Sequence, residues 1–254
     1  MVGKPLVGII GGVGPAATAR LSMTIVDRTL ASCDQDHVRT LVANDTTLPD
    51  RSAFILGRSD RSPLPGLIAD ARFLEESGCC AIALPCNTAH HFWSEVQASV
   101  EIPLINMVRE TALACKTAGM RNVGVLATEG TIAVGVYDEA LKEAGLNPVH
   151  PDADVQKAVT SLIYDGVKAG KQVTSAHLNP LVEAMKQRGC DGVILGCTEL
   201  SEAAANAEYG APAPQDILPV VDSIIVLANR VIDAAGATRR YTTTYYTAAE
   251  PYKA

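Results

Sequence analysis

Aromatic residues make up only 4% of this 254-residue chain, and their scarcity argues against one class of function. Proteins that bind single-stranded nucleic acid stack successive bases on aromatic side chains. Positive charge is also scarce, because 21 Lys and Arg residues are outnumbered by 28 Asp and Glu residues, for a formal net charge of −7. Binding to a phosphate backbone needs clustered Lys and Arg. The composition therefore disfavours a nucleic-acid-binding protein.

Long hydrophobic runs and paired cysteine motifs are missing as well. No stretch approaches the roughly 20 apolar residues of a membrane span, and the first apolar run, residues 6–10, is too short for a signal peptide. The 7 cysteines are odd in number and scattered, and none forms a CxxC pair. We therefore expect reduced thiols in the cytoplasm, no metal site and no membrane partner.

What the chain does have is a regular alternation of apolar strands and amphipathic helices, with 48% hydrophobic residues. Such alternation is typical of an α/β fold in which helices cover a parallel sheet. The tail after Thr238 is rich in Thr and Tyr and carries no periodicity. The pattern predicts extended segments at 4–10, 38–43, 80–84, 102–106, 123–128, 148–151, 192–195 and 217–221, and helices at 15–30, 67–76, 87–100, 107–118, 134–144, 155–168, 174–188 and 222–234.

Two stretches of the chain repeat one another. Eight positions separate Gly78 from Cys86, and eight separate Gly189 from Cys197; each interval opens on Gly-Cys and crosses an apolar strand. Residues 6–10 resemble 122–126, and residues 102–106 resemble 217–222. We therefore expect two similar flavodoxin-like or Rossmann-like α/β domains with parallel sheets, related by a pseudo-twofold axis, with the active site in the cleft between them. The expected domains are 1–101 plus 217–254, and 102–216.

Two thiols on opposite sides of one ligand would suit a particular chemistry. A thiol with a pKa near 8.5 is a fair acid, and its thiolate a fair base, near neutral pH. One thiolate can remove a proton from a tetrahedral carbon while the opposing thiol returns a proton to the other face. The carbanion between them needs converging hydrogen-bond donors, and helix starts after Cys86 and Cys197 would favour a carboxylate and a thiolate.

Four motifs together resemble the aspartate/glutamate racemase family, on its aspartate racemase branch: Gly11-Gly12-Val13-Gly14-Pro15, Leu48-Pro49-Asp50-Arg51, Pro85-Cys86-Asn87-Thr88-Ala89-His90 and Gly196-Cys197-Thr198-Glu199-Leu200. The resemblance covers the chain up to the Thr/Tyr-rich tail. It implies a racemase that needs no pyridoxal phosphate or other cofactor. Its substrate would be an acidic amino acid, aspartate first and glutamate second, and it would form a homodimer.

The resemblance also implies roles for individual residues. Cys86 and Cys197 would be the proton-transfer pair, and Arg51 would bind the distal carboxylate of the substrate. The lysine that contacts substrate would be Lys168, with Lys171 as the alternative. Asn87, Thr88 and Thr198 would hold the α-carboxylate and amino group, and Gly12, Ala89, Thr128 and Glu199 complete the expected substrate-binding set.

Three other hypotheses fit parts of the sequence. Residues 12–17 match the G-x-G-x-x-A fingerprint of an NAD(P)-dependent oxidoreductase, but the acidic partner expected about 20 residues on is poorly matched by Asp45, 28 positions past Ala17. A related thiol-dependent isomerase would act on a broader set of amino acids, on a hydantoin or on maleate. A non-catalytic binding protein would have no need of both thiols. We interpret Cys79, Cys80, Cys115 and Cys190 as buried packing residues, and His90 and His91 as structural.

Overall fold

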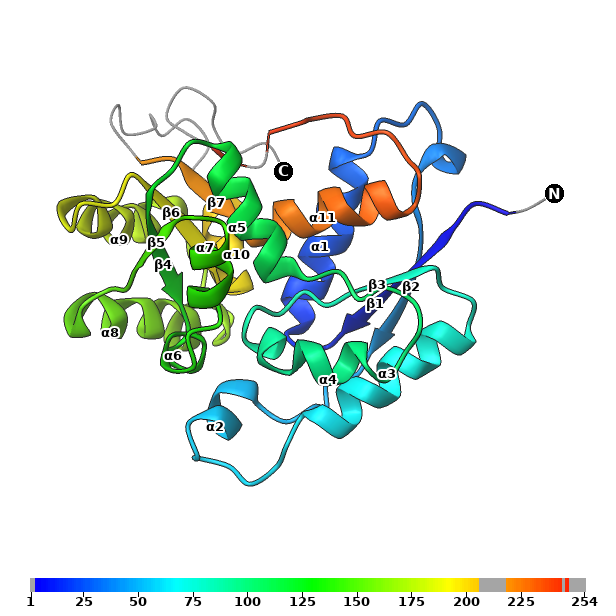
Figure 1. Cartoon of the computed structure of the whole chain (residues 1–254), viewed down its shortest axis with the longest axis horizontal. Helices are drawn as coiled ribbons and strands as arrows, with labels where there is room; N and C mark the ends of the chain where they lie inside the picture. The colour runs from blue at the N-terminus through cyan, green and yellow to red at the C-terminus, as the bar shows by residue number, and fades with distance from the viewer. Residues whose placement is uncertain (1–2, 206–217, 244, 247–254) are drawn as a thin grey trace. The chain divides into compact units, whose positions relative to one another are not determined.

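The computed structural model describes residues 3–205, 218–243 and 245–246. These residues divide into two compact units. Unit 1 contains residues up to 107 together with 224–242, and unit 2 contains the described residues of 108–223 together with 243, 245 and 246. Each unit is an α/β sheet covered by helices, as the alternating pattern predicts (Figure 1).

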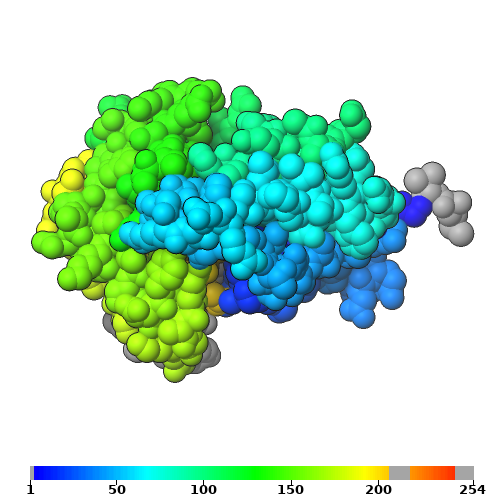
Figure 2. Space-filling model, turned by 90° about the horizontal axis from the view of Figure 1, so that it is seen from below, coloured from blue at the N-terminus to red at the C-terminus, as the bar shows by residue number. Residues whose placement is uncertain are grey.

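Unit 1 is built on a parallel three-stranded sheet in the order β2-β1-β3, in which Leu104 adds a single parallel bridge to Ile82. Its elements are β1 (Leu6–Gly11), α1 (Pro15–Arg28), a 3-10 helix (Asp34–Asp36), β2 (Arg39–Asn44), α2 (Arg51–Ile55), α3 (Leu64–Glu76), β3 (Ala81–Ala83), a 3-10 helix (Thr88–Phe92), α4 (Trp93–Gln97) and most of α11 (Ser223–Ala234). In the space-filling view, α3 (cyan) and the segment around α4 (blue-green) lie side by side on one surface of this unit (Figure 2).

Unit 2 has a five-stranded sheet in the order β5-β4-β6-β7-β8, parallel except for β8, which pairs antiparallel with β7. Its elements are most of α5 (Met107–Thr117), β4 (Asn122–Ala127), α6 (Glu129–Ala133), α7 (Asp138–Glu143), β5 (Asn147–Val149), α8 (Ala153–Ser161), a π-helical turn (Leu162–Val167), α9 (Ser175–Gln187), β6 (Gly192–Gly196), α10 (Thr198–Ala205), β7 (Val220–Asp222) and β8 (Tyr245–Tyr246).

The two sheets share one strand order, which matches the repeat seen in the sequence. The strands β2, β1 and β3 and the Leu104 bridge of unit 1 correspond to β5, β4, β6 and β7 of unit 2. The cysteine-delivering strands β3 and β6 therefore occupy the same place in their sheets.

Gly78 and Gly189, which open the two repeats, have φ values of 82° and 83°, and a second pair of glycines makes room for the cysteine that follows each of them. A Cβ atom at Gly8 would lie 3.2 Å from the Sγ atom of Cys79, and a Cβ atom at Gly124 would lie 3.2 Å from that of Cys190. Each central strand thus lacks a side chain where a cysteine packs against it. The first cysteine of each repeat therefore contributes to packing, and the second cysteine, Cys86 or Cys197, lies at the candidate site.

The last helix returns to the first unit. Leu227 and Val231 of α11 pack with Val7 and Ile9 of β1 and with Leu21 of α1. The last helix is therefore part of the hydrophobic core of unit 1.

The unit boundaries differ from the predicted ones. They fall after Met107 and Ser223 rather than after residues 101 and 216. Residues 102–106 stay with unit 1 because the backbone of Ile82 bonds to Pro103 and Ile105 on either side of the Leu104 bridge. Strand β7 stays with unit 2 because it pairs in parallel with β6.

Several element predictions need correction. The predicted strand 102–106 is a single bridge at Leu104. The predicted helix 134–144 is shorter, because residues 134–137 form a turn in which Gly135 has a φ of 60°, and only α7 lies within the predicted range. The predicted helices 87–100 and 155–168 contain a 3-10 helix and a π-helical turn, respectively. Of the predicted strand 217–221, residue 217 lies outside the described residues. None of the described helices is long and apolar enough to cross a membrane.

Candidate active site

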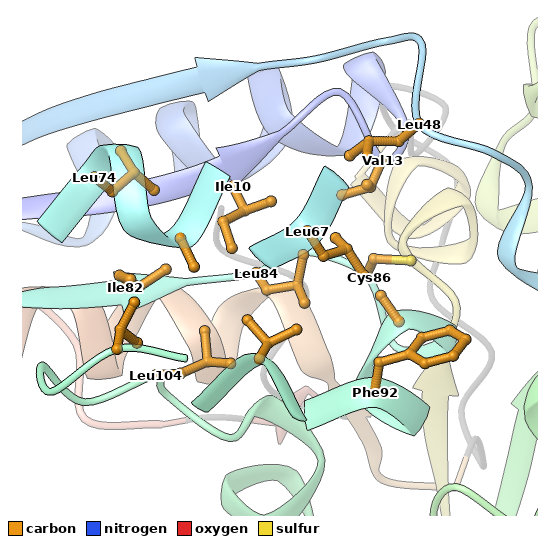
Figure 3. Close-up of a cluster of buried hydrophobic side chains, with 14 of the residues drawn as sticks. Ile10, Val13, Leu48, Leu67, Leu74, Ile82, Leu84, Cys86, Phe92 and Leu104 are labelled. Carbon is orange, nitrogen blue, oxygen red and sulfur yellow. The ribbon is translucent and has the colours of Figure 1, made fainter. Parts of the chain in front are cut away.

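Each unit places a buried cysteine just past the carboxyl end of the strand that follows its central strand in the sheet, β3 or β6. Cys86 follows β3 and is 7% exposed, and Cys197 follows β6 and is 6% exposed. In parallel α/β sheets, ligands bind at this edge. Figure 3 shows Cys86 at one end of the hydrophobic cluster of unit 1, with its sulfur directed away from Leu84 and Ile82.

The turn that carries Cys86 is held by His90. The ring Nδ1 lies 2.9 Å from the carbonyl oxygen of Cys86, and Nε2 accepts a hydrogen bond of 3.0 Å from the backbone N–H of Met107. Because Nε2 is an acceptor, Nδ1 carries the proton and donates it to the carbonyl. Burial lowers the pKa of His90 below its ordinary value of 6.5, so the ring is neutral at physiological pH. With both nitrogens bonded to the backbone, His90 serves structure, as the sequence predicts.

Asn87 and Thr88 follow Cys86 in the same turn. Both side chains are buried, at 2% and 6% exposure, and each has polar interactions within the chain. Ala89 is fully buried and belongs to the hydrophobic cluster. Its methyl group therefore packs in the core, although the resemblance places it among the substrate-binding residues.

Arg51 is joined to the glycine loop after β1. Its Nη2 donates to the carbonyl oxygen of Val13 at 2.9 Å, and its Nη1 donates to that of Pro49 at 3.2 Å. The side chain is only 9% exposed. Asp50 caps α2 directly before it by accepting from the N–H of Ala53 at 2.7 Å. These contacts fix the guanidinium at the carboxyl edge of the unit 1 sheet.

Gly12 takes a backbone role in this loop. Its φ of 81° and the 2.2 Å from a Cβ atom placed there to the carbonyl oxygen of Asp45 exclude any larger residue. Its N–H donates to the hydroxyl of Thr18 at 3.0 Å. Gly12 thus lets the loops after β1 and β2 approach each other. The hydroxyl of Thr18, a residue that the sequence motifs did not single out, accepts the hydrogen bond from the N–H of Gly12.

The unit 2 cysteine has an acidic partner. The thiol of Cys197 donates a hydrogen bond of 2.9 Å to Oε2 of Glu199, which also accepts 3.2 Å from the hydroxyl of Thr198. Burial, and then the charge of Glu199, raise the pKa of Cys197 well above its ordinary value of 9.0. The residue two positions after Cys86 is Thr88, so the repeat puts a carboxylate beside only one of these two thiols.

Lys168 completes this cluster. Its Nζ lies 3.7 Å from Oε1 of Glu199 and 4.8 Å from the ring centroid of Tyr164, a neighbour that the sequence did not reveal. The π-helical turn ends at Lys168, and such turns are often found at functional sites. The alternative, Lys171, is exposed.

Thr128 follows β4 at the same sheet edge. Its hydroxyl caps α6 by accepting from the N–H of Thr131 at 3.2 Å, and it is 3% exposed. Among the described residues, no three His, Cys, Asp or Glu side chains are grouped as a metal site requires.

The family to which these features point is also the one that most of the sequence matches. The family model described as Asp/Glu/Hydantoin racemase matches residues 10–231. The chain is 30% identical over 235 residues to the broad specificity amino-acid racemase RacX of Bacillus subtilis, covering 89% of this chain and 96% of that protein. The chain therefore belongs to the Asp/Glu/hydantoin racemase family, and it is an isomerase of the amino acid racemase class.

Solved structures agree with this assignment. The aspartate racemase of Picrophilus torridus superposes with a TM-score of 0.76 at 31% identity, over 93% of this chain and 96% of that one. A glutamate racemase of Francisella tularensis, in complex with D-glutamate, has a TM-score of 0.63 at 16% identity, over 91% and 81%. The second likeness is one of fold.

Proposed function

We propose that this protein racemises an acidic amino acid, aspartate before glutamate, by a two-base mechanism in which Cys86 and Cys197 act on opposite faces of the α-carbon. The observation that carries the proposal is that each unit ends the corresponding strand of its sheet in a buried thiol. Two such thiols, one from each half of a duplicated fold, suit a reaction that treats the two faces of one carbon alike.

The proposed step balances without a cofactor. One cysteine, as thiolate, takes the α-proton, and the electron pair of the C–H bond remains on the α-carbon and its carboxylate. The opposing cysteine, as thiol, then donates its proton to the other face. At the end the configuration of the α-carbon is inverted, and the two cysteines have exchanged protonation states. The reverse reaction or proton exchange with solvent restores the original states.

We assign Glu199 to proton handling rather than to substrate binding. Its carboxylate accepts from the Cys197 thiol, so it is placed to take that proton when Cys197 must act as a base. A carboxylate would also repel both carboxylates of an acidic substrate. Lys168, 3.7 Å away, compensates the charge of Glu199 on the opposite oxygen.

Arg51 and Lys168 are the proposed carboxylate ligands. An arginine fork pairs with a carboxylate through two parallel hydrogen bonds. The two carbonyls that hold its Nη atoms orient the fork before substrate arrives. Asn87, Thr88 and Thr198 remain the proposed ligands of the α-carboxylate and amino group, with Thr128 at the edge of the same proposed site.

The nicotinamide alternative is disfavoured by the loop after β2. Asp45 lies 28 positions past Ala17 instead of about 20, and its Oδ1 accepts from the N–H of Thr47 at 2.8 Å and from the hydroxyl of Thr47 at 2.6 Å, as a turn-stabilising aspartate does.

A panel of amino acids in deuterated water tests the proposal. Aspartate should exchange its α-hydrogen and racemise, with glutamate slower and neutral amino acids slower still. Equal rates across neutral and acidic side chains would indicate a broad-specificity racemase. Exchange only with a hydantoin, or isomerisation only of maleate, would refute the proposed substrate class.

We further infer that the enzyme works in a reducing compartment, the cytoplasm, because all 7 cysteines are free thiols, including the exposed Cys33 and Cys80. We also propose that it assembles as a homodimer. Sedimentation velocity at micromolar concentration would detect the dimer, and a monomer at all concentrations would refute it.

A further inference from the structure

The residue four positions after each cysteine makes an equivalent connection in the two units. After Cys86 this residue is His90, whose Nε2 accepts from the N–H of Met107. After Cys197 it is Ser201, whose hydroxyl donates 2.7 Å to Oδ1 of Asp222. Both contacts join the cysteine-bearing turn to a point far along the chain, 17 and 21 positions away.

The far ends of these contacts correspond as well. Met107 begins α5, and Asp222 directly precedes α11. These are also the places where the chain passes from one unit to the other, after Met107 and after Ser223. Each contact therefore ties a cysteine-bearing turn to the segment through which the chain leaves that unit.

Both connections are buried and reinforced. Ser201, Asp222 and Ser223 are fully buried, and the hydroxyl of Ser223 donates 2.8 Å to the carbonyl oxygen of Leu195 in β6. His90 is 8% exposed and holds the carbonyl of Cys86 through its other nitrogen. Buried hydrogen bonds to one fixed partner restrict a turn to one geometry, since the alternative is an unpaired polar group.

We propose that His90 and the Ser201–Asp222 pair are matched positioning residues, each of which holds one cysteine in register with the crossover segment of its own unit. The proposal rests on the proposed two-base function. In that reaction, displacing a catalytic thiol by about 1 Å would lower the rate of proton transfer, on the order of a hundredfold. His90 should affect the position and reactivity of Cys86 alone, and the Ser201–Asp222 pair those of Cys197 alone.

A half-reaction separates the two cysteines. With 3-chloroaspartate, one base removes the α-proton, the C–H electron pair forms the Cα–Cβ double bond, and chloride leaves. Only one cysteine is needed, so each α-enantiomer reports on the thiol that faces its α-hydrogen. The Cys86→Ala and Cys197→Ala variants identify which enantiomer depends on which cysteine.

The test compares His90→Phe with Ser201→Ala in the full-length protein. We expect His90→Phe to slow elimination from the Cys86-dependent enantiomer by about tenfold or more, and Ser201→Ala to slow the other enantiomer, each leaving the second enantiomer within about twofold. Asp222→Asn keeps an acceptor for Ser201 and should retain most of the rate. The matched control is Thr24→Val, which removes an equally buried hydroxyl from α1, where it bonds only the carbonyl of Arg20 among the contacts described.

Equal slowing of both enantiomers by either variant would overturn the proposal, as would no slowing of either. If His90→Phe does not fold, His90→Asn and His90→Gln divide the two contacts of the ring, and both should show the same enantiomer preference.

A second measurement does not depend on the proposed reaction. Iodoacetamide modification, followed by peptide mass spectrometry, gives the alkylation rate of each cysteine. His90→Phe should change the rate at Cys86 alone, and Ser201→Ala the rate at Cys197 alone. If the wild-type protein eliminates neither enantiomer, the proposed function fails while this readout still decides the positioning role: paired changes support it, and changes at both cysteines or at neither refute it.

Discussion

Replacing Glu199 by Gln should separate the acidity of Cys197 from its usefulness as a base. The carboxylate raises the pKa of the thiol, so the neutral amide should lower that pKa and make Cys197 more readily alkylated. The same change removes the acceptor that lies 2.9 Å from Sγ. If Glu199 takes the thiol proton during catalysis, racemisation should become slower although the thiolate becomes easier to form.

The size of the effect follows from the contact. A hydrogen bond to a charged group contributes about 1.5–3 kcal/mol, and about 1.36 kcal/mol corresponds to a factor of ten in rate. We therefore expect kcat to fall about 10- to 150-fold. Gln keeps the shape of the side chain, so KM should change much less than kcat.

The assay is chiral chromatography of aspartate, paired with the alkylation rate of Cys197 at several pH values. Glu202→Gln is the control, because it makes the same change three residues along α10. The reasoning fails if Glu199→Gln keeps the wild-type kcat, or if Cys197 becomes slower to alkylate.

Three further predictions follow from the other contacts of the site. Arg51→Ala should raise KM for aspartate about 10- to 150-fold, the loss expected for a charged hydrogen bond, with little change for alanine; equal changes for both substrates would remove Arg51 from the distal carboxylate. Because burial lowers the pKa of His90 below 6.5, the unfolded chain takes up a proton more readily than the folded chain as the pH falls; the wild type should thus lose more unfolding free energy than His90→Gln between pH 7.5 and 5.5 in urea titrations, and equal losses would contradict this. Gly12→Ala should lower the thermal unfolding temperature by several degrees or more, since its Cβ would lie 2.2 Å from the carbonyl oxygen of Asp45 and φ is 81°. An unchanged unfolding temperature would contradict this, because it would mean that the loop after β2 moves aside without a cost in stability.

The sequence predicted those parts of the fold that depend on local pattern. The alternation of strands and helices predicted two sheets that are parallel apart from β8, and the equal spacing from glycine to cysteine marked strands β3 and β6 as equivalent. Gly78 has a positive φ just before the strand, and the strand that follows it carries the chain to Cys86, which is why this spacing was informative.

Features that depend on distant partners could not be predicted. Residues 102–106 have strand composition, but only Leu104 forms a bridge to Ile82. Residues 134–144 keep a helical period, but Gly135 adopts a positive φ in a turn, and the helix begins only at Asp138. In both cases tertiary contacts or one backbone conformation outweighed the local preference.

The candidate site follows the same division. The positions of Cys86 and Cys197 could be predicted because each terminates a strand of the repeat. The contact of Glu199 with Cys197 could not, because a carboxylate after a cysteine is equally compatible with substrate binding or with solvent. His90 was recognisable as structural, but Met107 as its partner required the folded chain.

The most direct test of the two-base mechanism is the position of deuterium early in the reaction. Pure L-aspartate is incubated with the wild-type enzyme in deuterated water, and the L and D pools are separated before about a tenth of the substrate has reacted. If two cysteines act from opposite faces, the D-aspartate should carry solvent deuterium while the remaining L-aspartate keeps its original hydrogen. Deuterium entering the L pool as fast as the D pool, or D-aspartate formed with the original hydrogen, would contradict the mechanism.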